Sequence, residues 1–238
     1  RDLHSFPTRR SSDLRFDVDI NASAFEGCSK LTSISFGAAD GLNIASKAFA
    51  NCTSGLAANT NASLVFNTLK EVTIAGTDAT DGAFLNTTKL NTITFGASEN
   101  LTINPFAFYN TASAGKAATV TFGDAKDLLI GASAFSGIAK AETITFGDIE
   151  DLDATASDLG TNAFNGATIL KTLTFGDLTD ITISTNAFKD ASKDLTGSNV
   201  ATATFGNLEN TLFENKVFDG ASKLQTVTIG DVLDSQIG

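Results

Sequence analysis

A recurring phrase organises the whole sequence. It reads roughly Thr-Ile-Thr-Phe-Gly, then an apolar pair, then Ala-Phe, and it returns along nearly all of the 238 residues. Its glycine falls at Gly37, Gly76, Gly96, Gly123, Gly147, Gly176, Gly206 and Gly230. The phenylalanine of the Ala-Phe pair, which is once Val-Phe, falls at Phe25, Phe49, Phe84, Phe108, Phe135, Phe164, Phe188 and Phe218. Gaps of 24 to 35 residues between these phenylalanines are typical of a solenoid, in which each coil packs against its neighbours.

Each repeat predicts two short strands. Residues 92–95 read Thr-Ile-Thr-Phe, and this alternation is typical of a strand with one buried face. We expect the following Gly96 to leave the strand through a positive φ, where glycine has no Cβ clash. The apolar pair Leu101 and Ile103 predicts a second strand, and the Ala-Phe pair opens a compact turn. The sequence therefore predicts a mainly β solenoid of about eight repeats, joined by short turns or single helical turns.

Phenylalanine is expected to form the core. Equivalent inward positions stack when coils stack, so two ladders of aromatic rings are predicted. The first ladder comprises Phe36, Phe95, Phe122, Phe146, Phe175 and Phe205, and the second comprises the eight phenylalanines of the Ala-Phe turns. Two longer repeats indicate insertions, and we expect residues 53–70 and 151–160 to protrude as loops.

The first residues do not follow the repeat. Residues 4–14 read HSFPTRRSSDL, which resembles the translation of a common short-read sequencing adapter. We therefore expect residues 1–14 to be an artefact outside the fold. Residues 15–238 are expected to form a single solenoid domain, truncated at both ends because the repeat begins and stops partway through a unit.

Charge and composition exclude several classes of function. The chain carries 16 basic and 27 acidic side chains, a net charge of −11, which argues against nucleic acid or an anionic membrane as a partner. No apolar run reaches the roughly 18 residues that span a bilayer, so no membrane insertion is expected. The one histidine, His4, lies in the adapter-like segment, so a histidine-based catalytic or metal site is not expected.

Three recurring groups of side chains could in principle carry chemistry. Cys28 and Cys52 lie one repeat apart, and we favour reduced core thiols over a disulfide between adjacent coils. Ser-Lys pairs such as Ser192-Lys193 recur before the first strand, and we interpret the lysines as solvated edge residues rather than parts of a nucleophilic dyad. Aspartates recur after the turn glycine at Asp124, Asp148, Asp177 and Asp231, and three residues later at Asp127, Asp151, Asp180 and Asp234.

These aspartates leave two interpretations. Stacked carboxylates could bind calcium, whereas aspartate is also an ordinary cap for turn amides. We favour turn capping because the glycine-rich calcium pattern of β-rolls is absent. We predict no catalytic residues, no cofactor and no metal, and hence no enzymatic activity.

The turn carries a family resemblance. Residues 24–34 read AFEGCSKLTSI, which resembles the unit of BspA-type leucine-rich repeats, in which Ala-Phe is followed by Cys, Leu and a short Ile-rich strand. Residues 83–95 and 217–229 repeat the pattern with Thr87 and Ala221 in place of the cysteine. The resemblance implies a solenoid of leucine-rich-type repeats on an extracellular, cell-surface protein, often linked to adhesion, with a host or cell-surface protein or glycan as its partner.

Threonines flank the inward residue of the first strand in most repeats. They are Thr92, Thr94, Thr119, Thr121, Thr143, Thr145, Thr172, Thr174, Thr202, Thr204, Thr226 and Thr228, with Ser33 and Ser35 as a variant. We expect them to form two parallel rows on the outer face of a sheet, the candidate binding surface. A purely structural ladder in a spacer array is one alternative. The rows also resemble the ice-binding face of β-solenoid antifreeze proteins, although the repeat lengths are less uniform than such a face usually requires.

Overall fold

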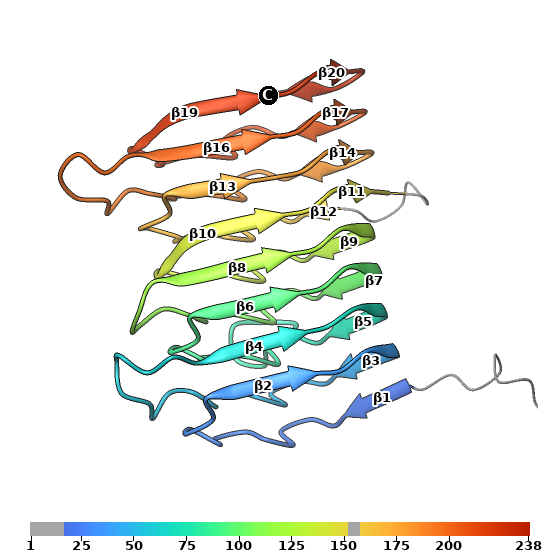
Figure 1. The fold of residues 1–238 in the computed structure, drawn as a ribbon, viewed down its shortest axis with the longest axis vertical. Coiled ribbons are helices and arrows are strands. Elements are labelled where there is room, and N and C mark those ends of the chain that lie inside the picture. Colours follow the sequence, from blue (N-terminus) through green and yellow to red (C-terminus); the bar gives the residue numbers. More distant parts are fainter. Residues whose placement is uncertain (1–16, 152–157) are drawn as a thin grey trace, which may run out of the picture.

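The computed structural model describes residues 17–151 and 158–238 of the chain. The adapter-like residues 1–14 therefore lie outside the described residues, as does the central part of the expected loop 151–160. Figure 1 shows the described residues as a stack of similar coils, and each coil contributes strands to two parallel sheets. The predicted mainly β solenoid is confirmed. No helix in the described ranges is long and apolar enough to cross a membrane.

The first strands of the repeats form an eight-stranded parallel sheet with the order β19-β16-β13-β10-β8-β6-β4-β2 (Figure 1). Its strands are β2 (Ser33–Phe36), β4 (Ser63–Phe66), β6 (Thr92–Phe95), β8 (Ala118–Phe122), β10 (Ala141–Phe146), β13 (Thr172–Thr174), β16 (Ala201–Phe205) and β19 (Leu224–Ile229). Neighbours in space are consecutive coils, so every hydrogen-bonded pair joins one repeat to the next. This is the arrangement expected of a solenoid.

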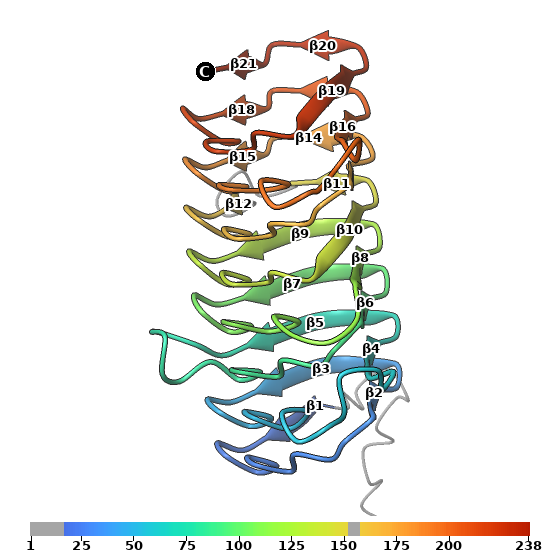
Figure 2. The ribbon, with the colours of Figure 1, turned by 90° about the vertical axis from the view of Figure 1, so that its left-hand side faces the viewer.

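The second strands form a thirteen-stranded sheet that meets the first along one edge, while the turns close each coil on its third side (Figure 2). Five strands are continuous: β1 (Asp17–Ile20), β3 (Ala39–Ile44), β5 (Leu69–Ile74), β7 (Ser98–Ile103) and β9 (Ala125–Ile130). The later coils have two short strands instead: β11 (Ile149–Glu150), β12 (Asp158–Leu159), β14 (Leu178–Thr179), β15 (Thr182–Ile183), β17 (Leu208–Glu209), β18 (Leu212–Phe213), β20 (Val232–Leu233) and β21 (Gln236–Ile237). Asp180, Asn210 and Asp234 adopt φ of 60°, 48° and 49° at three of these breaks, and this left-handed geometry ends a strand.

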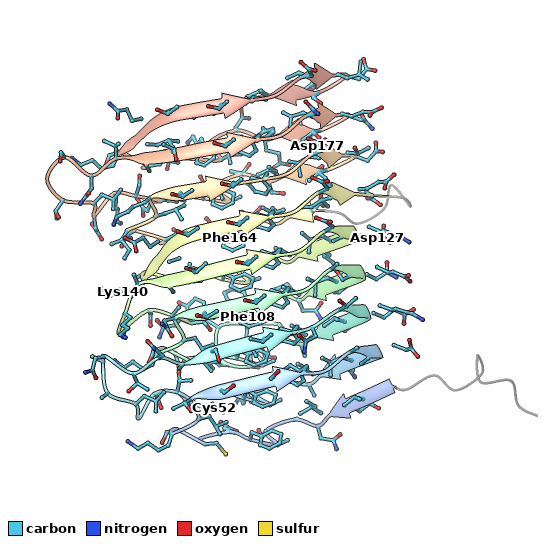
Figure 3. The ribbon with its side chains drawn as sticks, in the orientation of Figure 1. Cys52, Phe108, Asp127, Lys140, Phe164 and Asp177 are labelled. Atoms are coloured by element: carbon cyan, nitrogen blue, oxygen red, sulfur yellow. The ribbon has the colours of Figure 1, made fainter. Side chains whose placement is uncertain are left out.

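Both predicted phenylalanine ladders are present, and they define the core. Along the first ladder the ring centroids of neighbours lie 4.3–5.0 Å apart, and along the second 4.6–5.6 Å apart. The two ladders meet edge to face, as between Phe122 and Phe135 at 5.8 Å. Phe108 and Phe164, both in the second ladder, lie inside the stack in Figure 3. Offset-stacked and edge-on pairs are the favoured aromatic geometries.

The turns reverse the chain through residues in left-handed conformation. The second residue after each ladder phenylalanine has a positive φ in all eight turns: Gly27, Asn51, Asn86, Asn110, Gly137, Gly166, Asp190 and Gly220. Glycine, asparagine and aspartate are the residues that tolerate this conformation at least cost. The composition of these turns is therefore a backbone requirement, and none of the described turns is an α-helix.

The prediction that residues 53–70 form one protruding loop is wrong. Residues 63–66 form β4, and Leu69 already opens β5, so Phe66 joins the first ladder. The sequence pattern did not reveal this repeat, because Ser-Leu-Val-Phe lacks the threonines and is followed by Asn67 in place of glycine. Gly76 is consequently not a member of the glycine row, because it follows the second strand of its coil. The inserted residues are 53–62 and 77–81.

The other expected loop falls partly outside the description. Residues 152–157 are not described, but Asp151 is buried and Asp158–Leu159 form β12, which pairs with β9 and β15. A segment that pairs on both sides belongs to the sheet. The prediction that all of 151–160 protrudes is therefore wrong at both of its described ends.

The expectation that the turn glycines adopt a positive φ is also wrong. None of the glycines of this row, from Gly37 to Gly230, has a positive φ. Instead, most of them touch the backbone of the preceding coil. A Cβ on Gly123 would lie 2.7 Å from the Ala97 nitrogen, and one on Gly206 would lie 2.7 Å from the Gly176 carbonyl carbon. Glycine is required here by close approach between coils.

Candidate binding face

The outer face of the eight-stranded sheet is built from alternating residues. In β6, Ile93 and Phe95 are buried, whereas Thr92 is exposed and Thr94 is half-buried. The same alternation in the other strands turns the threonines outward, because successive side chains of a strand point to opposite faces. We call the set of outward residues at these two positions in all eight strands the Thr face.

The strand register aligns these residues into two rows. The first row is Ser33, Ser63, Thr92, Thr119, Thr143, Thr172, Thr202 and Thr226, and the second is Ser35, Val65, Thr94, Thr121, Thr145, Thr174, Thr204 and Thr228. The structure thus places all twelve sequence-predicted threonines on one face. Sequence reasoning missed Ser63 and Val65 because β4 was overlooked. The role of these residues in binding stays a prediction.

The Thr face carries neither charge nor an aromatic ring. Its sixteen positions hold twelve threonines, three serines and one valine. Charged groups lie at the ends of the strands instead. Lys171 pairs with Glu142 at the entry side, and the aspartates that follow the turn glycines line the exit side. A neutral strip of mostly β-branched side chains therefore runs along an acidic molecule.

The aspartates at the exit side cap backbone amides of neighbouring coils. Asp124 Oδ1 accepts the Asp148 N–H at 3.1 Å, Asp148 Oδ1 accepts the Asp177 N–H at 2.9 Å, and Asp177 Oδ1 accepts the Asn207 N–H at 2.7 Å. Turn capping, the interpretation favoured from the sequence, accounts for Asp124, Asp148 and Asp177 in this row. In the second row the Asn210 side-chain amide donates to Asp180. Across residues 17–151 and 158–238, no group of three or more His, Cys, Asp or Glu side chains is arranged to hold a metal ion.

A groove of about 420 Å³ lies beside this aspartate row. Ala125 and Ser98 lie on its floor, at the position that Ile149 and Leu178 occupy in later coils, so the smaller side chains leave the space open. Asp124 and Asp148 also line it, but each already accepts a backbone amide. These two aspartates therefore have structural roles, and Lys126, Glu150 and Asp177 are the other charged residues that line the groove.

Two of the Ser-Lys pairs, Ser29-Lys30 and Ser192-Lys193, do not form dyads in the described coils. Lys193 pairs with Asp190 at 3.1 Å, while the buried Ser192 hydroxyl has no hydrogen-bond partner. Lys30 donates to the Gly55 carbonyl. The lysines therefore contact groups other than the preceding serine.

The two cysteines are free and differ in environment. Cys52 is fully buried and its thiol donates to the Phe25 carbonyl at 3.0 Å, whereas Cys28 is exposed. Burial, with a smaller contribution from nearby Cys28, raises the pKa of the Cys52 thiol to about 11. The reduced state expected from the sequence is present, but only Cys52 is a core thiol. Its neighbours in the stack, Thr87 and Thr111, hydrogen-bond each other at 3.0 Å.

Two carboxyl groups outside the Thr face have shifted pKa values. Burial alone would raise the pKa of Asp81, but hydrogen bonds from the Asp78 and Thr77 amides and the Thr77 hydroxyl lower it to about 2. Burial raises the pKa of Asp158, and repulsion by Glu214 and Asp151 acts in the same direction. Asp81 stabilises the inserted loop 77–81, and Asp158 lies in β12, so both shifts have structural causes.

The repeat unit matches a known family. The sequence profile described as BspA type Leucine rich repeat region matches the chain in six copies, over residues 17–115, 67–196 and 129–235. These ranges together cover nearly all of the described coils. No curated protein and no solved structure matches the chain.

Proposed function

The chain belongs to the BspA-type leucine-rich repeat family, and from this premise we propose that it is a non-enzymatic binding domain whose Thr face is the recognition surface. The partner in this proposal is a protein or glycan on a host or another cell. The domain would act outside the cell, at the cell surface, as part of an adhesive protein. Repeat families of this kind present extended surfaces to their partners.

The continuity of the Thr face is the observation that carries the proposal. Exposed flat sheets invite edge and face aggregation, and natural proteins usually interrupt them with charges. Here sixteen outward positions contain no charge at all, although the chain carries 43 charged side chains elsewhere. Keeping charges off this one face is consistent with an uncharged surface as its partner.

The structural roles of the aspartates and of Cys52 described above support the non-enzymatic part of the proposal. Enzyme sites combine a pocket with a nucleophile, a base and groups that orient them. The described groove offers carboxylates that cap amides, and the buried Cys52 thiol is held protonated by its raised pKa. These groups have structural roles that need no reaction.

The experiment compares two variants with equal charge change. The face variant carries lysine at Thr143, Thr145, Thr172 and Thr174, and the control variant carries lysine at Asn43, Thr73, Thr102 and Leu129. The control positions form one outward row on the thirteen-stranded sheet. Binding of the labelled chain to host cells and to protein and glycan arrays is measured, together with the melting temperature.

We expect the face variant to lose binding and to keep its fold, while the control variant binds as the unmodified chain does. Attachment that survives in the folded face variant would contradict the proposal and would move the binding site to the inserted loops.

A further inference from the structure

The register of the Thr face suits a second class of ligand besides a protein or a glycan. Neighbouring threonines along a row are separated by the strand spacing of about 4.7–4.9 Å, and the two rows by two residues, or about 6.6 Å. Six consecutive coils, from β6 to β19, carry threonine in both rows. The face is therefore a two-dimensional lattice of hydroxyl and methyl groups.

The variation in repeat length does not interrupt this lattice. The longer segments, residues 53–62, 77–81 and 192–200, all fall between strands, and in Figures 1 and 2 the loops extend beyond the edges of the stack. The two register shifts of the sheet occur where strands begin, at Ala141 and Ala201, before the first threonine of each strand. The non-uniform repeats, which argue against a regular face in the sequence alone, therefore leave the face regular.

The side chains of the face suit a rigid, uncharged ligand. Threonine is stiff at χ1, and backbone pairing on both sides fixes every strand of the sheet except the edge strands β2 and β19, so few rotamers are lost on binding. The tyrosine, tryptophan and arginine side chains that dominate protein interfaces are absent from all sixteen positions, while threonine, serine and valine are under-represented in such hot spots. The face therefore offers many small contact points of similar strength in place of a few large anchors.

We propose that the Thr face binds ice. Ice is an uncharged lattice of water molecules whose oxygen atoms repeat in two directions on each crystal face. Ordered threonine hydroxyls and methyl groups can meet such a lattice at many points at once, and the many weak contacts then add up. This inference rests on the proposed function, because it requires that the Thr face is the binding surface of the domain.

The test is thermal hysteresis, the gap between the melting and growth temperatures of an ice crystal in the protein solution. We expect the unmodified chain and the control variant to show a gap and to enter growing ice, and the face variant to lose both. Melting curves establish that all three proteins are folded. Because both variants gain four positive charges, a general charge effect would reduce the activity of both equally.

Two outcomes would overturn the inference. Retained hysteresis in the folded face variant would show that another surface binds ice. Absence of hysteresis from the folded, unmodified chain would show that ice is not the ligand. In that second case the array measurements decide the proposed function separately, because loss of protein or glycan binding in the face variant would still identify the Thr face as the binding surface.

Discussion

Phenylalanine is the residue that fills each coil. The fully buried aromatic rings belong to both ladders and include Phe66, Phe108, Phe135 and Phe164. Burial of one such side chain contributes about 1.5–3 kcal/mol, so the two ladders together make a large contribution to stability. The open end of the second ladder differs, since Phe25 is 45% exposed.

Replacement of Phe135 by alanine tests the ladder. Phe135 is fully buried and stacks on Phe108 at 4.6 Å and on Phe164 at 5.0 Å, so its loss leaves a cavity between two coils. We expect the free energy of unfolding to fall by about 3–5 kcal/mol, measured by denaturant titration. Phe25→Ala is the control, and it should lower the free energy of unfolding by clearly less. Equal losses in the two variants would contradict the assignment of the stability to burial.

The cysteines give a second prediction at this scale. Native protein should react with a thiol reagent at pH 8 through Cys28 only, because Cys52 is buried and has a pKa of about 11. Unfolded protein should release two reactive thiols. Cys28→Ser should abolish the native reaction, and rapid labelling of that variant would show that Cys52 is accessible.

At the scale of the element, contacts with the neighbouring coils determine which residues each coil can carry at its turn positions. The glycine row exists because coils approach closely where the first strand ends, and the aspartates beside it bond to the next coil. Both features depend on contacts between residues 24 to 30 positions apart. Strand periodicity is local and could be read from the sequence, whereas these contacts could not.

Alanine at Gly147 tests this close approach. Its Cβ would lie 2.2 Å from Asp124 Oδ1 and 2.7 Å from the Asp124 backbone nitrogen. We expect a loss of about 1–3 kcal/mol in the free energy of unfolding, as for other overpacked sites. Gly37 is the matched control, because its Cβ would have no neighbour within 4 Å and its φ is not positive. Gly37→Ala should be neutral or stabilising, and a similar loss in both variants would refute the steric explanation.

Asp81 in the inserted loop 77–81 should make the free energy of unfolding depend on pH. Asp81 has a pKa of about 2 in the folded protein, below the ordinary value of 3.8, so its stabilising effect is present above about pH 4. That effect is lost as the pH falls from about 4 to about 2. The difference in unfolding free energy between the unmodified chain and Asp81→Asn should therefore shrink over this range. A difference that stays constant with pH would mean that the Asp81 charge does not stabilise the loop.

At the scale of the whole molecule, the solenoid, both ladders and the threonine rows could be predicted from the sequence. All three follow from a repeated local pattern, in which Thr92, Ile93, Thr94 and Phe95 alternate between the two faces of a strand. The sequence was insufficient where a repeat lost its markers, as in β4, whose Ser-Leu-Val-Phe has neither threonine nor a following glycine. It was also insufficient for the left-handed turn positions, because their φ values are set by closure of the coil.

The Thr face exists only if the repeats stay in register despite their unequal lengths. A shift of one residue would turn the threonines into the core and the apolar residues outward. Nuclear Overhauser contacts between selectively labelled threonine methyl groups measure the register directly. We predict two separate chains of contacts, one through Thr92, Thr119, Thr143, Thr172, Thr202 and Thr226 and the other through their partners two residues later. Contacts between these methyl groups and phenylalanine rings, or between Thr119 and Thr145 in place of Thr119 and Thr143, would contradict the Thr face.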